Sequence, residues 1–209
     1  MLGTFISLEG CEGVGKSTQV RLLKEYLEKN NYDFISLREP GGTEISEKIR
    51  EILLSLKNQR MNEMTETMLY AAARTQLINE VIYPALGQGK MVIADRFVDS
   101  TIAYQGVARK IGIDTVIKLH ELTCDNLWPD ITIFLDLDPI LAFKRKGGVD
   151  RGDRLENAGL EFHQDVYKGY KEVARRYPNR VVSIQPLGDK YDTHNKIIET
   201  LKQKGFLND

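Results

Sequence analysis

The sequence predicts a three-layer α/β/α domain built on a five-stranded parallel sheet. Five short segments consist almost entirely of apolar residues, which is typical of strands that are buried on both faces. Between them lie longer segments whose apolar residues recur every three or four positions, the period of an amphipathic helix. Strands that alternate with helices form βαβ units, in which the strands run parallel and helices cover the sheet.

The first half of the chain is expected to supply three strands and three helices. In order, these are a strand at 4–9, a helix from Lys16, a strand at 34–37, a helix over 45–56, a helix over 64–86 and a strand at 91–94. Val20, Leu23 and Leu27 lie on one face of the first helix. The third helix is the longest, because its apolar residues keep a step of three or four until a glycine-rich break.

The second half of the chain continues the alternation. In order, the expected elements are a helix through 116–124, a strand at 131–135, a helix from Asp138-Pro139, a helix over 162–177, a strand at 181–184 and a last helix through 197–201. Asp138 is a favourable N-cap, and Pro139 suits the first helical position because that position needs no N–H donor. The count of five strands completes the predicted sheet.

The chain is expected to form a single domain, residues 1–209, since a domain commonly takes about 100–200 residues. The least regular internal stretch is 144–156, which is rich in glycine and basic residues and has one apolar residue before Leu155. This composition predicts a mobile loop.

Composition excludes several classes of protein. With 42% hydrophobic and 28% charged residues, the chain resembles globular proteins and not disordered ones. No apolar stretch approaches the roughly 18 residues of a membrane helix, and the acidic start does not fit a signal peptide. A net charge of -1 disfavours a nucleic-acid binder. The chain has two cysteines, which form no C-x-x-C pair, and this usage indicates a reducing cytoplasm. Its three histidines do not have the spacing of zinc ligands, so no zinc site is expected.

A glycine-rich loop follows the first strand. Residues Gly10–Ser17 fit the pattern G-x-x-x-x-G-K-[ST], in which glycines let successive backbone N–H groups turn toward a phosphate. Lys16 is able to reach the outer phosphates, Ser17 offers a hydroxyl to Mg²⁺, and the following helix adds the positive end of its dipole. These features predict a site for a nucleoside triphosphate with Mg²⁺.

Switch GTPases, motor ATPases and kinases all use such a loop. A GTPase needs a guanine-reading N-K-x-D motif, and the nearest match, Asn195–Ile198, lacks the aspartate. A motor of 209 residues would be unusually small and would need partner subunits. A kinase needs a second anionic site, a base-reading surface and a cationic lid, and the chain has a candidate for each.

Four arginines are candidates for the second anionic site. Arg38 and Arg96 end the second and third strands, and Arg50 and Arg74 lie on the helices that follow the second strand. Ligands of open α/β sheets bind at the carboxyl ends of strands, and arginine suits bidentate phosphate binding. The four side chains are therefore expected to converge on a monophosphate, although each alone could be a surface ion pair.

Further motifs accompany these residues. They are Glu12 within the loop, Arg38–Thr43, Tyr70–Arg74, Asp95–Thr101, Ala103–Gly106, Pro129-Asp130 and Asp153–Glu156. With this set the chain resembles the thymidylate kinases along essentially its whole length. The resemblance implies a P-loop fold of the nucleoside monophosphate kinase type, transfer of the γ-phosphoryl group of ATP to dTMP for dTTP synthesis, Mg²⁺ dependence, a cytoplasmic homodimer, and neither nucleic acid nor membrane as a partner.

The resemblance also implies roles for single residues on the ATP side. ATP is expected at Gly10, Cys11, Glu12, Gly13, Val14, Gly15, Lys16, Ser17, Thr18 and Arg145. Ser17 and Asp95 would lie at the metal, and stretch 144–156 resembles the lid of the family. Catalysis is expected to depend on Lys16, Asp95, Arg96, Arg151 and Arg154.

On the acceptor side, the resemblance distributes residues along dTMP. Arg38, Arg50 and Arg96 are expected around its phosphate, Tyr70 stacked on thymine, Arg74 near the thymine carbonyl O4, Thr101 reading the base, and Tyr104 and Gln105 along the deoxyribose. Two positions vary within the family. Glu12 stands where a basic residue would be catalytic, which implies the branch that supplies this charge from Arg145, Arg151 or Arg154 of the lid. Phe97 stands where Tyr or His is commoner.

Two alternatives remain open at the level of the sequence. A deoxynucleoside kinase would need a carboxylate base near the 5′-hydroxyl of its acceptor, whereas a monophosphate acceptor needs arginines, in which this chain is rich. A non-enzymatic, nucleotide-gated assembly subunit would bind the triphosphate without an acceptor. Release of ADP that depends on the acceptor distinguishes these possibilities.

Overall fold

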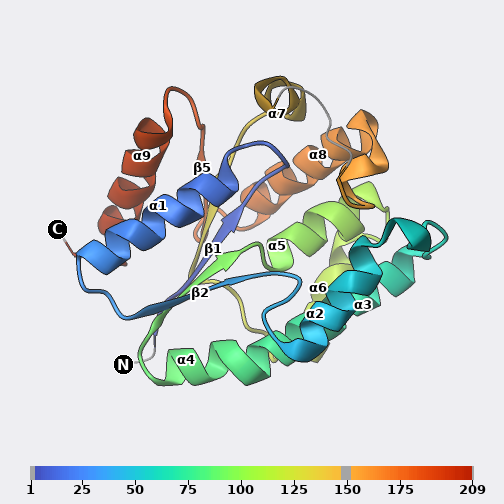
Figure 1. Cartoon of the computed structure of the whole chain (residues 1–209), viewed down its shortest axis with the longest axis horizontal. Helices are drawn as coiled ribbons and strands as arrows, with labels where there is room; N and C mark the ends of the chain where they lie inside the picture. Colours follow the sequence, from blue (N-terminus) through green and yellow to red (C-terminus); the bar gives the residue numbers. More distant parts are fainter. Residues whose placement is uncertain (1–2, 147–151, 209) are drawn as a thin grey trace.

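The structure, a computed structural model, describes residues 3–146 and 152–208. At its centre lies a parallel sheet in the strand order β2-β3-β1-β4-β5 (Figure 1). The strands are β1 (Phe5–Glu9), β2 (Phe34–Arg38), β3 (Met91–Asp95), β4 (Ile131–Leu135) and β5 (Val181–Ile184). The three-layer architecture, the five strands and their parallel direction are therefore confirmed.

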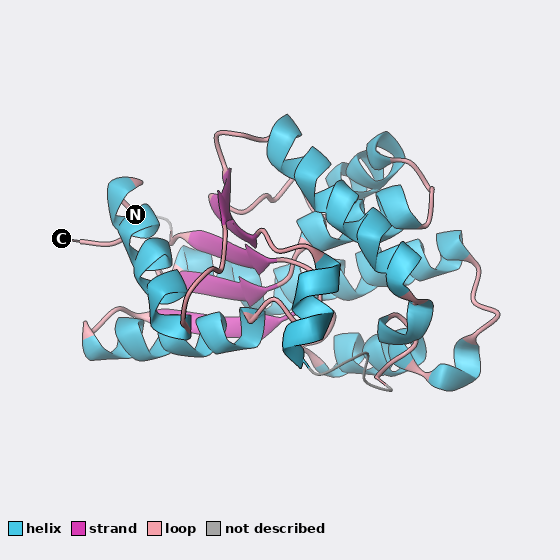
Figure 2. Cartoon of the chain, turned by 90° about the horizontal axis from the view of Figure 1, so that it is seen from above, coloured by secondary structure: helices cyan, strands magenta, loops and turns pink. Residues whose placement is uncertain are grey.

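Helices cover both faces of the sheet (Figures 1 and 2). They are α1 (Lys16–Lys29), α2 (Glu44–Leu54), α3 (Glu63–Leu77), α4 (Tyr83–Gly87), α5 (Val98–Thr101), α6 (Ile113–Thr123), α7 (Pro139–Lys146), α8 (Leu160–Arg176) and α9 (Lys190–Gln203). Helices α1 and α9 pack together on one side, and α8 packs against a π-helical turn, η3 (Ile102–Ala108), on the other. No helix in the described ranges is long and apolar enough to span a bilayer.

Strand β2 is less buried than its apolar sequence predicts. The order of the sheet places β2 at one edge, where it pairs with β3 alone. Its residues are half-buried or exposed, whereas all five residues of β1 are buried. The expectation of burial on both faces holds for the central strands and is wrong for this edge strand.

The helix expected over 64–86 forms, with a change of winding in its middle. It consists of α3, a π-helical turn, η2 (Ile78–Ile82), and α4. The expected helix over 45–56 ends earlier, at Leu54, and a short 3₁₀ turn, η1 (Leu56–Asn58), follows it. Helix α2 and the start of α3 also differ in burial: their apolar residues Ile45, Ile52, Met64 and Met68 are exposed. Part of the predicted apolar stripe therefore faces outward.

A helical segment that the apolar spacing does not indicate follows β3. Helix α5 and η3 together span 98–108, and almost every side chain from Val98 to Gly106 is buried. Since a segment that is buried all round has no amphipathic period, the pattern does not identify it as a helix. Helix α8 approaches it closely at Gly169, where a Cβ atom would lie 2.7 Å from Cα of Ala103.

The loop predicted at 144–156 is shorter than expected. Lys144 to Lys146 form the last turn of α7, and Glu156–Ala158 form a 3₁₀ turn, η4. Residues 147–151 lie outside the described residues, and they include Arg151, which the sequence analysis expects to be catalytic.

The carboxyl ends of the three strands that precede the candidate motifs meet at one edge of the sheet. Asp95 of β3 is paired in register with Leu8 of β1 on one side and with Arg38 of β2 on the other. The loop after β1, the turn after β2 and the turn after β3 therefore emerge side by side.

Candidate functional site

A cleft of about 630 Å³ opens at this edge of the sheet. It brings together most of the residues expected from the sequence: Cys11, Glu12, Gly13, Gly15, Lys16, Ser17, Thr18, Arg38, Arg50, Tyr70, Arg74, Asp95, Arg96, Thr101, Tyr104, Gln105 and Arg145. Of the expected residues that the structure describes, Gly10, Val14 and Arg154 do not line it. The two groups of residues, one for a triphosphate and one for a monophosphate, thus share a single cavity.

The loop between β1 and α1 has the backbone that an anion cradle needs. Gly15 precedes α1 with φ 93°, in the left-handed region, and a Cβ atom there would meet nothing within 4 Å. Gly13 is also left-handed, and its Cα lies close to α7, since a Cβ atom would stand 3.0 Å from the carbonyl oxygen of Ala142. The first turn of α1 has neither an acidic residue nor a side-chain cap. Its N–H groups therefore remain available to a phosphate.

Lys16 lies in the cleft and forms an ion pair with Asp95 across the gap between α1 and β3. Burial lowers the pKa of Lys16, the nearby charge of Arg96 lowers it further, and Asp95 opposes both effects. A phosphate group that enters the cleft competes with Asp95 for this ammonium group.

Arg38 and Arg50 present two cations at one place. Nη1 of Arg50 donates to the carbonyl oxygen of Pro40 at 2.8 Å, and Nη1 of Arg38 points at the same oxygen at 3.4 Å. Glu47 partly balances Arg38 through a 3.0 Å ion pair. The pKa of Arg50 is lowered by burial and then by the like charge of Arg38. Two like charges in a shared cavity favour an anionic ligand.

Arg96 stands between these arginines and the loop. Its backbone has φ 71°, which is unusual for a residue with a side chain. Its Nη1 donates to the carbonyl oxygen of Gly10 at 3.0 Å and to two hydroxyl groups, and its guanidinium lies 5.3 Å from the ring centre of Tyr104. Within the described part of the chain, Nε and Nη2 have no hydrogen-bond partner. These two donors are free for a ligand.

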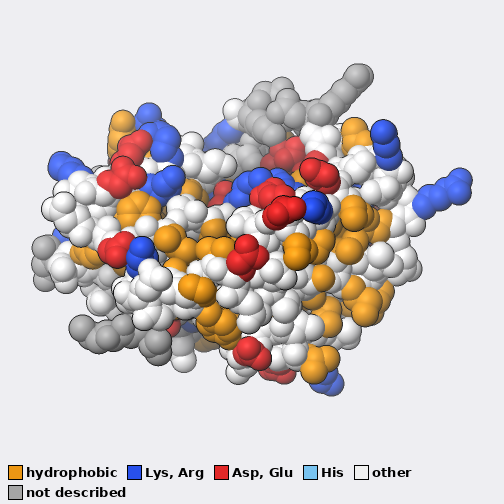
Figure 3. Space-filling view, turned by 60° about the horizontal axis from the view of Figure 1, so that its bottom comes forward, with side chains coloured by type: hydrophobic (Ala, Val, Ile, Leu, Met, Phe, Trp, Pro, Cys, Tyr) orange, Lys and Arg blue, Asp and Glu red, His pale blue; other side chains and the backbone are white. Residues whose placement is uncertain are grey.

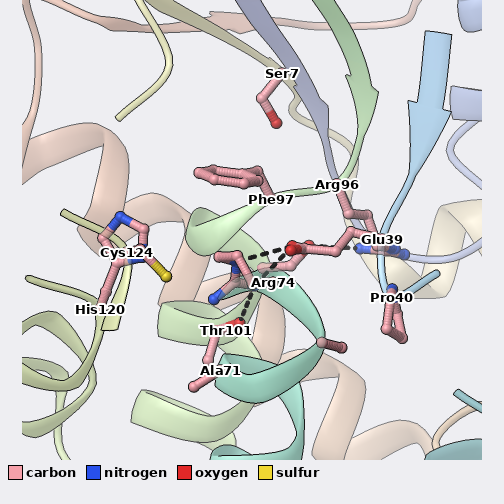
Figure 4. Close-up of polar contacts among 12 residues, drawn as sticks. Ser7, Glu39, Pro40, Ala71, Arg74, Arg96, Phe97, Thr101, His120 and Cys124 are labelled. Atoms are coloured by element: carbon pink, nitrogen blue, oxygen red, sulfur yellow. Dashed lines mark hydrogen bonds and ion pairs between the residues drawn. The ribbon is translucent and has the colours of Figure 1, made fainter. Parts of the chain in front are cut away.

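Arg74 differs from the other three arginines, because a carboxylate neutralises it. It is buried, with an exposed fraction of 2%, and binds Oε2 of Glu39 through Nε at 3.0 Å and Nη2 at 2.7 Å. Nη2 also donates to Oγ1 of Thr101 at 2.7 Å (Figure 4). Of the four arginines expected to converge on a monophosphate, only Arg38, Arg50 and Arg96 therefore remain available to it. Arg74 and Thr101 instead form one polar pair, as the resemblance implies for base recognition.

Two tyrosines and a glutamine line the space between these groups. Tyr70 and Tyr104 are largely buried yet present surface to the cleft, and burial raises the pKa of Tyr104 to about 12. Both therefore remain neutral phenols at physiological pH and offer ring faces to a ligand. Gln105 is held by a 2.8 Å hydrogen bond from its Nε2 to Oε1 of Glu66.

Arg154 does not lie in the cleft, contrary to what a catalytic arginine of the lid requires. It is buried against α2 and α3, where Nη2 pairs with Oε2 of Glu66 at 2.6 Å and Nε donates to the carbonyl oxygen of Leu53 at 2.9 Å. Arg145 does line the cleft, on the last turn of α7, and donates to the carbonyl oxygen of Pro186 at 2.8 Å. Arg151 lies outside the described residues.

Ser17 and Asp95 fit a magnesium ion in kind and place. Both line the cleft and both offer oxygen atoms, the ligands that Mg²⁺ prefers. Among the described residues there is no cluster of three or more histidine, cysteine or acidic side chains.

Several residues that organise the cleft escaped the sequence analysis. Glu9 and Tyr170 are buried and bind each other beside Arg96, and Glu66 and Glu39 each neutralise an arginine. A signal for Glu9 was available, because it is the one charged residue of a buried strand, directly before the loop. Tyr170 gave no such signal, since it lies on the apolar face of its helix.

Comparisons with known proteins identify relatives of the chain. The family model described as thymidylate kinase matches residues 8–197. A thymidylate kinase of Caldanaerobacter subterraneus subsp. tengcongensis is 44% identical over 203 residues, which cover 97% of this chain and 97% of the relative. One of Finegoldia magna is also 44% identical, over 97% of this chain and all of the relative. The crystal structure of a thymidylate kinase from Ehrlichia chaffeensis superposes with a TM-score of 0.76 at 33% identity, covering 96% of this chain and 99% of that one.

Proposed function

The chain belongs to the thymidylate kinase family, which transfers the γ-phosphoryl group of ATP to dTMP, and from that premise we propose how the cleft binds its two substrates. The observation that carries the proposal is the shared cavity, which is lined by the loop after β1 and by Arg38, Arg50 and Arg96. Among the described residues, Arg96 has free donor atoms, and Arg38 and Arg50 share one carbonyl acceptor. A kinase for a monophosphate needs these two anion sites in one space.

On the acceptor side, the phosphate of dTMP lies among Arg38, Arg50 and Arg96. Thymine lies toward the Arg74–Thr101 pair, which offers donors to a carbonyl group of the base, and the ring of Tyr70 stacks on it. The deoxyribose passes Tyr104 and Gln105, whose side chains limit the space around the sugar. The buried pair of Arg74 with Glu39 supports this direction, because a neutralised arginine suits a neutral base better than a phosphate.

On the donor side, the phosphates of ATP lie in the loop 10–17, with Lys16 on the outer phosphates, and Thr18 and Arg145 border the nucleotide. Ser17 and Asp95 hold Mg²⁺, which when bound neutralises phosphate charge. Lys16 leaves its pairing with Asp95 as the phosphates enter, so that both residues change partners together.

Phosphoryl transfer depends mainly on how the protein positions its two substrates and on positive charge around the transferring group. Lys16 and Arg96 supply two of these charges, and both line the cleft near the loop after β1. The loop carries Glu12 and has no arginine of its own. The proposed source of the third charge is Arg151, which lies in the sequence between α7 and η4. Arg154 is assigned a positioning role instead, because its guanidinium is already committed to Glu66.

The protein is proposed to act as a homodimer in the cytoplasm. Exposed apolar side chains lie on three neighbouring helices, α2, α3 and α6, and Figure 3 shows hydrophobic side chains gathered on one face of the molecule. Their most exposed members are Ile45, Ile52, Met64, Met68 and Leu122. A face of this kind fits a second copy of the chain. The cytoplasmic location is supported by the two cysteines, which are buried and unpaired.

Release of ADP, measured by a coupled assay, tests the proposed function. Wild-type protein with ATP and Mg²⁺ is expected to release ADP rapidly with dTMP, and far more slowly with dCMP, AMP or no acceptor; dUMP measures how strongly the thymine methyl group is read. Lys16→Ala is expected to abolish turnover while circular dichroism shows an intact fold, since the ammonium is a charge on the phosphates. Equal ADP release with and without acceptor would contradict the kinase assignment and support an ATPase.

A further inference from the structure

The side chain of Arg96 is held by atoms that the reaction does not use. Its Nη1 donates to the hydroxyl group of Tyr170 at 2.8 Å and to that of Ser100 at 3.2 Å. Tyr170 lies on α8, 74 positions further along the chain, and does not line the cleft. Unlike Arg74, which pairs with Glu39, Arg96 forms no ion pair with a carboxylate within the described part of the chain, although the charges of Glu9 and Asp95 lie near it.

Both hydroxyl groups are in turn oriented by one buried carboxylate. Oε2 of Glu9 accepts from Ser100 at 2.6 Å and from Tyr170 at 3.0 Å. Oε1 of Glu9 accepts from the backbone N–H of Phe97, the residue after Arg96, at 2.6 Å. Glu9 therefore contacts the turn that carries Arg96 and both hydroxyls that receive its side chain.

The direction of these hydrogen bonds explains why the group at position 9 must be an acceptor. The two hydroxyl groups also lie 2.8 Å from each other, and either could donate across this contact. Each hydroxyl has one proton, and an ionised Glu9, which accepts from both, favours the arrangement in which both protons point toward it. The lone pairs of both hydroxyls then face Nη1 of Arg96, which is a donor only. A donor in place of Oε2 would reverse the two hydroxyls and turn their protons toward the guanidinium.

We propose that Glu9, Ser100 and Tyr170 form a positioning network that fixes the guanidinium of Arg96 for the acceptor phosphate, without any of the three carrying out a chemical step. This inference rests on the proposed placement of dTMP. It assigns Glu9 and Tyr170, which lie outside the expected site residues, a function in acceptor binding beyond their part in the core. The left-handed backbone of Arg96 fits this view, because a strained residue persists where its surroundings hold it.

Steady-state kinetics of Tyr170→Phe at pH 8 test the network. The variant keeps the ring and loses the hydroxyl. We expect the KM for dTMP to rise by about tenfold, as the loss of one hydrogen bond to a charged group allows, while the KM for ATP changes less than about twofold. Tyr167→Phe is the matched control, because it also removes a hydroxyl group from α8. The hydroxyl of Tyr167 donates to Asp136 at 2.7 Å and forms no hydrogen bond with Arg96 within the described part of the chain. Its KM for dTMP should equal that of wild type.

A double-mutant cycle with Arg96→Ala shows whether Tyr170 acts through Arg96. If it does, Tyr170→Phe adds almost nothing to the KM for dTMP once Arg96 is absent. Additive effects, or a rise in both KM values together with a fall in Tm, would overturn the inference and leave Tyr170 a core residue.

Glu9→Gln is the second variant, expected to raise the KM for dTMP at least as much as Tyr170→Phe. An unchanged KM in both variants also refutes the network. The KM values of these variants test the network alone. The proposed function fails only if wild-type protein does not phosphorylate dTMP.

Discussion

Four arginines of similar sequence context acquire different chemistry from their partners. Arg74 is neutralised by Glu39 inside the core, whereas Arg96 donates to hydroxyl groups and forms no ion pair with a carboxylate within the described part of the chain. Arg38 and Arg50 share one carbonyl oxygen and have no buried carboxylate. The neighbours of each arginine therefore decide how much of its charge is compensated inside the protein, and this difference supports the separate roles that we propose for them.

Tyr70→Ala is expected to weaken dTMP far more than ATP. The ring lines the cleft, and the loss of a stacked base partner, about 1–3 kcal/mol, corresponds to a rise of roughly five- to hundredfold in the KM for dTMP. Initial rates at saturating ATP measure this effect. If Tyr70 served the core alone, Tm would fall and both substrates would be affected alike.

Glu9 makes stability depend on pH near neutrality. Burial raises the pKa of Glu9 to about 7, the negative charge of Asp99 adds to the rise, and Arg96 opposes it. The other charged or titratable groups whose electrostatics involve Glu9 are Lys16, Arg74, Tyr104 and Tyr170. Because the folded state binds this proton more tightly than the unfolded state, stability is lost as the pH rises from about 4.5 through about 7.

Glu9→Gln removes this titration. The free energy of unfolding, measured in urea at pH 5 and at pH 8, should fall less between the two pH values in the variant than in wild type. The same decrease in both proteins would show that Glu9 does not titrate in this range.

At the level of elements, the end of the predicted lid is part of the acceptor side of the molecule. Arg154 follows the segment that joins α7 to η4, yet its guanidinium is buried between α2 and α3. Glu66, its partner, also binds Gln105 of η3. One carboxylate therefore ties together three elements that border the acceptor site.

The two arginines at positions 151 and 154 should separate in their effects. Arg154→Ala leaves Glu66 buried with weaker partners, so we expect a loss of about 3 kcal/mol in unfolding free energy, measured in urea. Arg151→Ala should instead lower kcat by about tenfold or more with nearly unchanged dissociation constants, as a charge that acts in the transition state does.

Single-turnover phosphoryl transfer distinguishes these outcomes. If Arg154→Ala has normal stability but slow phosphoryl transfer, Arg154 takes part in catalysis after all. Normal transfer in Arg151→Ala would move the missing charge to Arg145 or to the acceptor site.

For the whole molecule, the expectation of a homodimer depends on the exposed apolar faces of α2 and α3. Amphipathic spacing in these helices predicts burial, and the single chain leaves Ile52, Met64 and Met68 exposed. Such a stripe is explained if a second copy of the chain covers it. The periodicity of the sequence is then satisfied by the dimer and not by the monomer.

Ile52→Glu combined with Met68→Glu is expected to convert a dimer into a monomer. The carboxylates would be buried without partners in an interface, whereas they are solvated on a free surface. Light scattering coupled to size-exclusion chromatography measures the mass, which for one chain is 23.8 kDa. Leu187→Glu, on an exposed apolar residue outside these helices, is the control and should remain dimeric. A wild-type mass of one chain would exclude the dimer.

The sequence by itself determined the sheet, its parallel direction and the place of the phosphate loop. These follow from local properties: runs of apolar residues, helical periodicity and glycines at fixed spacing. Because parallel strands end at one edge, the convergence of Arg38, Lys16 and Arg96 could also be predicted. The helical segment 98–108 could not, since a segment buried on all sides has no polar face to mark its period.

Only the tertiary structure decided which partner each polar side chain has. The pairs Arg74–Glu39, Arg154–Glu66 and Arg96–Tyr170 join residues far apart in the chain. Their spacing carries no pattern, because distant residues meet through the packing of whole elements. The charge that an arginine can offer to a phosphate depends on these contacts. The partners that distinguish Arg74 and Arg154 from Arg96 therefore became visible only in three dimensions.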